Sequence, residues 1–149
     1  MATVRVEAVL DVSAQRAWAA IADVGAVHRR LLPGRVSDVR IENDTRILTM
    51  PDGSEVRELI VSIDHEGRRL AYAVVEGQRL GLTYHHASFQ VYGDGERSRL
   101  VWLTDVLPHD LAPAVRARTE RAIVEIKRVL ESAAAEPVGA DPGRAARPA

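Results

Sequence analysis

The chain has 149 residues, 46% of them hydrophobic, so it is long and apolar enough to form one domain with a buried core. Its 20 basic and 21 acidic residues leave a formal net charge of −1, which excludes a strong field of one sign, so no nucleic acid partner is expected. The absence of cysteine excludes disulfides, thiol nucleophiles and cysteine-based metal sites.

The basic residues and the first segment bear on charged surfaces and on location. Only Lys127 is a lysine, but the arginines are scattered over every segment and alternate with acids, so we expect no arginine-rich phosphate-binding face. The first ten residues, MATVRVEAVL, lack the apolar region of a signal peptide, and no apolar run approaches the ~20 residues of a membrane span. We therefore expect a cytoplasmic protein without membrane insertion.

The first third of the chain predicts one strand and two short helices. Residues 3–10 alternate small apolar with charged side chains, which is typical of a strand with one buried face. Ser13 is placed to cap a helix over residues 14–22, in which Trp18 and Ile21 share one face. A second short helix is expected over residues 23–32, ended by a Pro-Gly pair.

Residues 36–107 predict six consecutive antiparallel strands, because turn residues interrupt the apolar runs at hairpin spacing. The turns fall at residues 43–44, 51–53, 65–67, 77–81 and 93–95.

A long helix is expected to follow the strands, capped by Asp110 and packed on the sheet through an apolar stripe. The stripe consists of Leu111, Val115, Thr119, Ala122, Ile123, Ile126 and Leu130. Residues 137–149 contain little that can be buried, so we expect them to form a disordered tail after a single domain over residues 1–136.

The order and spacing of several stretches resemble the START-like (SRPBCC) superfamily over about residues 3–134. These stretches are AQRAWAAIADVGAVHRRLLPG (14–34), VRELIVSID (56–64), RRLAYAVVEG (68–77), HHASFQVYGDG (85–95) and SRLVWLTDVLP (98–108). The superfamily includes pollen-allergen-like proteins and the polyketide cyclase/dehydrase and lipid-transport type. The resemblance implies an α+β helix-grip fold, in which a curved antiparallel sheet of about seven strands holds the C-terminal helix on its concave face. It also implies a cavity between sheet and helix, without fixing one activity.

The short loop at residues 65–67 limits the register of its hairpin. If Ile60 pairs with Tyr72, then Glu58 pairs with Val74, and one face is apolar apart from an acid and a phenol, as a ligand pocket requires. That face carries Glu58, Ile60, Leu70, Tyr72 and Val74. Resemblance to pollen-allergen-like members also implies that Glu58 and Tyr72 lie on the concave side.

The last hairpin admits two interpretations. Pairing Phe89 with Val101 places His85 opposite Asp105, where the carboxylate would orient the imidazole as a base or as a binding group. The resemblance instead implies that Trp102 points inward, which puts Asp105 on the opposite face unless a bulge intervenes. Phe89 itself, like Trp18, is expected in the core.

Three functions remain open from the sequence. The first is a carrier or sensor that binds a small hydrophobic ligand through Glu58, Ile60, Leu70, Tyr72, Val74, His85, Trp102 and Asp105. The second is a cofactor-free cyclase, dehydratase or isomerase in which Glu58, Tyr72 or His85 moves protons; the alternative for Glu58 is a structural carboxylate paired with an arginine. The third is a regulatory module that binds another protein.

Two further expectations concern metals and assembly. His85 and His86 are neighbours on a strand and point to opposite faces, so no metal site is expected, and no cofactor is implied. The oligomeric state is left open between monomer and homodimer.

Overall fold

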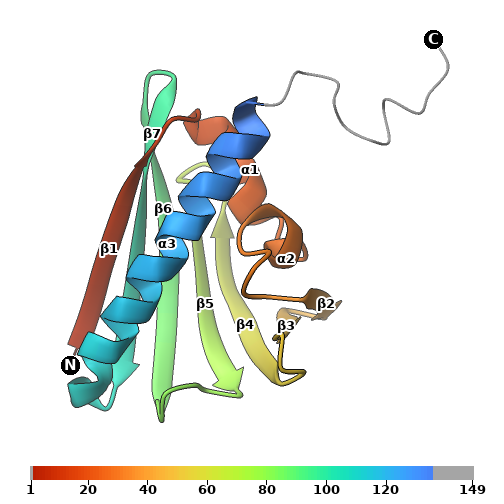
Figure 1. The fold of residues 1–149 in the computed structure, drawn as a ribbon, viewed down its shortest axis with the longest axis vertical. Coiled ribbons are helices and arrows are strands. Elements are labelled where there is room, and N and C mark those ends of the chain that lie inside the picture. The colour runs from red at the N-terminus through yellow and green to blue at the C-terminus, as the bar shows by residue number, and fades with distance from the viewer. Residues whose placement is uncertain (1, 136–149) are drawn as a thin grey trace, which may run out of the picture.

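In the computed structural model, which describes residues 2–135, a seven-stranded antiparallel sheet curves around one long helix (Figure 1). The strands are β1 (Ala2–Leu10), β2 (Asp38–Glu42), β3 (Thr45–Thr49), β4 (Glu55–Asp64), β5 (Arg69–Glu76), β6 (Tyr84–Asp94) and β7 (Arg97–Leu107). Their order across the sheet is β1-β7-β6-β5-β4-β3-β2. This arrangement confirms the predicted helix-grip fold. The expected tail over residues 137–149 lies outside the described residues.

Two short helices connect β1 to β2. α1 (Ala14–Ala22) begins as predicted, because the Ser13 hydroxyl accepts a hydrogen bond of 3.2 Å from the backbone amide of Arg16. α2 (Val27–Arg30) is shorter than the helix expected over residues 23–32. Asp23 ends α1, and residues 23–26 form a turn in which the Ala26 amide donates to the Asp23 carbonyl, so the helix starts only after Gly25.

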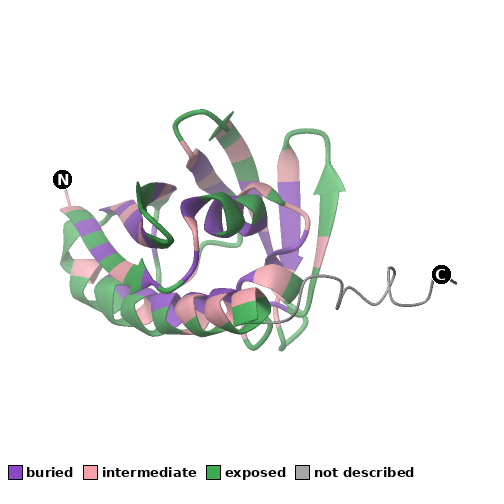
Figure 2. Cartoon of the chain, turned by 90° about the horizontal axis from the view of Figure 1, so that it is seen from above, coloured by how far each residue is buried: buried purple, intermediate pink, exposed green. Residues whose placement is uncertain are grey.

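The long helix α3 (Ala112–Ala135) lies on the concave face of the sheet, as predicted. Its buried residues are six members of the predicted stripe: Val115, Thr119, Ala122, Ile123, Ile126 and Leu130. Figure 2 shows the buried side of the helix turned toward the sheet and the exposed side turned outward. Asp110 does not cap the helix as expected; it lies in a 3₁₀ turn, η1 (His109–Leu111), that leads into α3.

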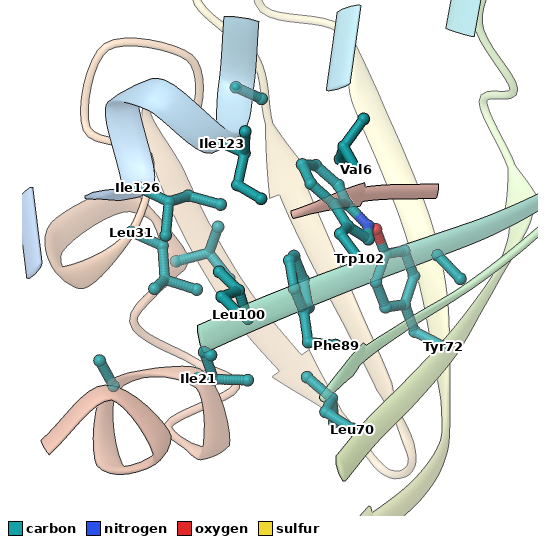
Figure 3. Packing of buried hydrophobic residues seen from close by; sticks show 14 of the residues in the cluster. Val6, Ile21, Leu31, Leu70, Tyr72, Phe89, Leu100, Trp102, Ile123 and Ile126 are labelled. Carbon is teal, nitrogen blue, oxygen red and sulfur yellow. The ribbon is translucent and has the colours of Figure 1, made fainter. Parts of the chain in front are cut away.

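The hydrophobic core fills the space between the sheet and the three α-helices. Figure 3 shows it extending from Ile21, Leu31 and Ile126 through Phe89 to Trp102. The Phe89 and Trp102 rings lie 4.7 Å apart between centroids. Trp18 and Phe89 are 7% and 4% exposed, which confirms their assignment to the core.

Candidate functional site

A cavity of about 170 Å³ lies between the concave face of the sheet and α3. Its apolar lining consists of Leu32, Val36, Leu48, Met50, Val56, Val74, Trp102 and Ala122. Its polar lining consists of Arg35, Glu58, Tyr72, Arg79, His85, Arg118 and Thr119. The cavity is therefore an apolar chamber with seven polar residues in its wall, three of which are arginines.

The register of β4 and β5 brings the predicted acid and phenol together. Glu58 pairs with Val74 and Ile60 with Tyr72, which confirms the predicted pairs, although an irregularity between Ile60 and Ser62 separates them from the register beside the loop. Glu58, Tyr72 and Val74 line the cavity, so the concave face carries one acid and one phenol as expected. Their role in binding stays a prediction.

Two apolar residues of the predicted set lie away from the cavity lining. Leu70 is fully buried in the core, where its strand faces Phe89 on β6. Ile60 is half-buried beside an irregularity of β4 that separates it from Ser62 in register. Both share the concave side of the sheet, but the cavity begins only toward the other end of β4 and β5.

Of the two interpretations of the last hairpin, the pairing of Phe89 with Val101 is wrong by one residue. Phe89 pairs with Trp102, and His85 pairs with Val106, so His85 and Asp105 do not face each other. Trp102 lines the cavity with His85, in agreement with what the resemblance implies. Asp105 lies on the opposite face, where it accepts a hydrogen bond of 2.6 Å from the Thr3 hydroxyl of β1.

Glu58 forms a buried ion pair with a residue directly across from it on β3. Arg46 pairs with Glu58 in register, and its Nε donates to Glu58 Oε1 at 2.7 Å. The two side chains are 4% and 11% exposed. Glu58 is thus held as an arginine-paired carboxylate, the alternative to a free base.

Tyr72 lies between this ion pair and the aromatic end of the core. The Arg46 guanidinium carbon is 5.0 Å from the centroid of the Tyr72 ring, within the range of a cation–π contact. Burial and the nearby Glu58 carboxylate raise the pKa of Tyr72 well above its usual value. Figure 3 shows its hydroxyl directed toward the indole of Trp102. The Tyr72 hydroxyl is therefore protonated at neutral pH and can donate a hydrogen bond.

His85 occupies the wall of the cavity next to Tyr72, with 6.3 Å between the two ring centroids. Burial, together with the charges of Arg118 and His86, lowers its pKa to about 4. The imidazole is consequently neutral across the physiological range.

His85 makes stability depend on pH in a defined window. Below pH 6.5, the ordinary value for histidine, the unfolded chain takes up a proton that the folded protein does not accept until about pH 4. We therefore expect the free energy of unfolding of the wild type to fall by up to about 3 kcal/mol between pH 6.5 and pH 4. His85→Gln should abolish this fall. Urea denaturation at a series of pH values measures it. His86→Gln is the control and should keep the loss; parallel curves for wild type and His85→Gln would contradict the assignment.

Three arginines that sequence reasoning set aside meet at the cavity. Arg35 follows α2, Arg79 lies between β5 and β6, and Arg118 lies on α3, yet all three line the same chamber. The sequence did not indicate this clustering of arginines, while the expectation of no phosphate-binding face stays a prediction. Scattering along the sequence does not imply scattering in space, and no local pattern identified these positions in advance.

Neither a metal-ligand cluster nor a membrane-spanning helix occurs among residues 2–135. Within residues 2–135, no three His, Cys, Asp or Glu side chains lie together in a group able to hold a metal ion. None of the helices in this range combines the length and the apolar character that a membrane crossing requires.

The chain belongs to the polyketide cyclase / dehydrase and lipid transport family, whose family model matches residues 1–135. No curated protein matches the sequence. Among solved structures, protein XoxI from Bacillus cereus is similar with a TM-score of 0.77 and 16% identity, covering 90% of this chain and 96% of that one.

Two further solved structures share the fold. A START superfamily protein from Mycobacterium smegmatis has a TM-score of 0.68 and 16% identity, covering 89% of this chain and 96% of that one. Norcoclaurine synthase from Thalictrum flavum, in complex with dopamine and hydroxybenzaldehyde, has a TM-score of 0.66 and 21% identity, covering 89% of this chain and 85% of that one. The START-like resemblance is confirmed at the level of family and fold.

Proposed function

We propose that this protein binds a small apolar organic molecule between the sheet and α3 and acts as its carrier or sensor. The observation that carries the proposal is the apolar cavity of about 170 Å³ with a few polar groups in its wall. An apolar cavity of about 150 Å³ holds benzene, so this chamber suits a body of roughly one aromatic ring. Norcoclaurine synthase, which shares the fold, is itself seen with one-ring compounds.

The state of the polar groups favours binding over proton transfer. Glu58 is occupied by Arg46 at 2.7 Å, so its carboxylate is not free to take a proton from a substrate. His85, with a pKa of about 4, is a weak base near neutral pH. Both groups are better suited to orienting a ligand than to moving its protons.

A cofactor-free cyclase or dehydratase is the second candidate. It is favoured by Tyr72, which lines the cavity. Its hydroxyl stays protonated and can donate a hydrogen bond to a substrate carbonyl. The third function, a regulatory module whose exposed helices bind another protein, stays a prediction.

Filling the cavity provides the direct test. Ala122 lines the chamber from α3, and Ala122→Leu should occupy space that the ligand needs while keeping the helix intact. We expect the variant to lose at least about tenfold in affinity for one-ring apolar compounds. The measurement is thermal stabilisation by a panel of such compounds, together with native mass spectrometry of the protein as purified.

The matched control is Ala117→Leu, which makes the same change on an exposed position of the same helix. It should bind as the wild type does. Wild-type protein that is stabilised by no member of the panel, or equal binding by the two variants, would overturn the proposed function.

A further inference from the structure

We propose that the ligand is an amphipathic anion, with its apolar body in the cavity and a carboxylate or phosphate head group bound among Arg35, Arg79 and Arg118. This inference rests on the proposed function and deepens it by naming the class of the ligand.

The three arginines form a half-buried rim drawn from separate parts of the chain. Arg35 comes from the connection between α2 and β2, Arg79 from the β5–β6 loop, and Arg118 from the first half of α3. Among the described residues, Arg35 and Arg118 form no ion pair, and Arg79 lies 3.9 Å from Asp52 and donates from Nη2 to the Ser54 hydroxyl at 2.7 Å. Three guanidinium groups around one small cavity fit an anionic head group, which accepts their donors in pairs.

The unpaired polar atoms around the cavity are all donors. Five buried side-chain nitrogen or oxygen atoms in residues 2–135 lack a hydrogen-bond partner, and three of them belong to the cavity lining. Two of these three are Nε of Arg35 and Nε of Arg79; the third, Nε1 of Trp102, faces the Tyr72 hydroxyl, which can serve as its acceptor. A buried donor left unpaired destabilises the protein, so a ligand that supplies acceptor oxygens would recover this free energy. A ligand that only donates would not.

The ion pair between Arg46 and Glu58, deeper in the protein, also leaves a donor without a partner. Arg46 is 3% exposed and directs Nε to Glu58, but its Nη1 is buried without a partner. The carboxylate of Glu58 is therefore engaged by Arg46, and it offsets the charge of Arg118 only in part. Burial lowers the pKa of Arg118, and the charges of Arg79 and Arg35 lower it further, which shows that the cations of the rim repel one another.

The nearby acids do not complete the site. Asp52 accepts hydrogen bonds from its own loop, at Ser54, and lies 3.9 Å from Arg79. Glu125 accepts from the Gly34 amide at 3.2 Å, beside Arg35 in the chain but without an ion pair to it. The rim thus carries an excess of positive charge that an anion would balance.

The experiment compares one skeleton with different head groups. Calorimetric titrations use 3-phenylpropanoate, its methyl ester, 3-phenylpropylamine and 2-phenylethyl phosphate, which share the phenylethyl body. We expect one of the two anions to bind at least about tenfold more tightly than the ester, and the amine to bind least. Which anion binds better separates a carboxylate from a phosphate site. Affinity for the anion, but not for the ester, should fall as NaCl is raised.

The residue test uses two positions on the same helix. Arg118→Gln should lower affinity for the anion about tenfold and leave the ester unchanged, and Arg35→Gln should act in the same direction. Arg121→Gln, on the exposed face of α3, is the control and should change neither.

The outcomes separate this inference from the proposed function. If the ester binds as well as the anions, or if Arg118→Gln binds the anion as wild type does, the anionic head group is refuted while the apolar cavity site stands. If none of the compounds and no member of the wider apolar panel binds, the proposed function fails and this inference fails with it.

Discussion

Replacing Glu58 with leucine is expected to lower the free energy of unfolding by about 3–5 kcal/mol. The carboxylate is the partner of Arg46 Nε at 2.7 Å, and the Arg46 side chain is only 4% exposed. Without Glu58, a full positive charge would remain buried and unpaired, next to an Nη1 that already lacks a partner. Urea denaturation followed by circular dichroism measures the change, which should appear in the midpoint and not in the slope.

Two further variants decide whether the charge is the cause. The double variant Arg46→Met with Glu58→Leu should recover most of the loss, because it replaces both charges with apolar groups of similar volume. Glu7→Leu breaks an exposed pair with Arg5, at 2.9 Å, and should cost less than about 1 kcal/mol. A loss for Glu58→Leu no larger than that for Glu7→Leu would contradict the buried ion pair.

The ion pair also explains why the cavity does not resemble an acid–base site. A carboxylate alone in an apolar chamber is the arrangement that prepares a general base. Here Arg46 lies directly across from Glu58 on β3 and over the Tyr72 ring, so the acid is neutralised as a pair. The free charges of the chamber belong to the arginines of its rim.

The sequence predicts the elements whose signals are local. Ser13 identifies the start of α1, and the apolar spacing from Val115 to Leu130 identifies the buried side of α3, because each signal lies within one element. The predicted pairing of Ile60 with Tyr72 places Glu58 and Tyr72 on the cavity side, but it depends on the irregularity between Ile60 and Ser62, because the pairs beside the loop are one residue out of that register. Family resemblance adds the way in which the elements assemble.

The missed features depend on contacts that no local pattern contains. In the last hairpin, Asp94 pairs with Arg97, so the turn is a two-residue loop with Gly95 at φ 63°, whereas pairing Phe89 with Val101 would centre the turn on Gly95. That difference of one residue exchanges the faces and moves Asp105 out of the cavity. Likewise, Arg35, Arg79 and Arg118 come together only because a connection, a loop and a helix meet around one chamber.

Replacing Trp102 with alanine is expected to have the second large effect, on both stability and ligand size. Trp102 packs against Phe89, with 4.7 Å between ring centroids, and lines the cavity. Its removal should cost about 3–5 kcal/mol. The vacated space adjoins the chamber, so the variant should gain two-ring compounds such as 2-naphthoate over one-ring compounds, measured by titration with each.

Trp18→Ala is the matched control for this prediction. Trp18 is as buried as Trp102, each at 7%, and it also donates from Nε1 to His65 Nδ1 at 3.2 Å. Its loss should therefore destabilise the protein to a similar extent, but Trp18 does not line the cavity and the preference for ring size should stay as in wild type. If both variants change their preference for ring size, then loosened packing of the core, and not Trp102 itself, sets that preference. A change confined to Trp102→Ala would assign the limit on ligand size to this one indole, at the boundary between core and chamber.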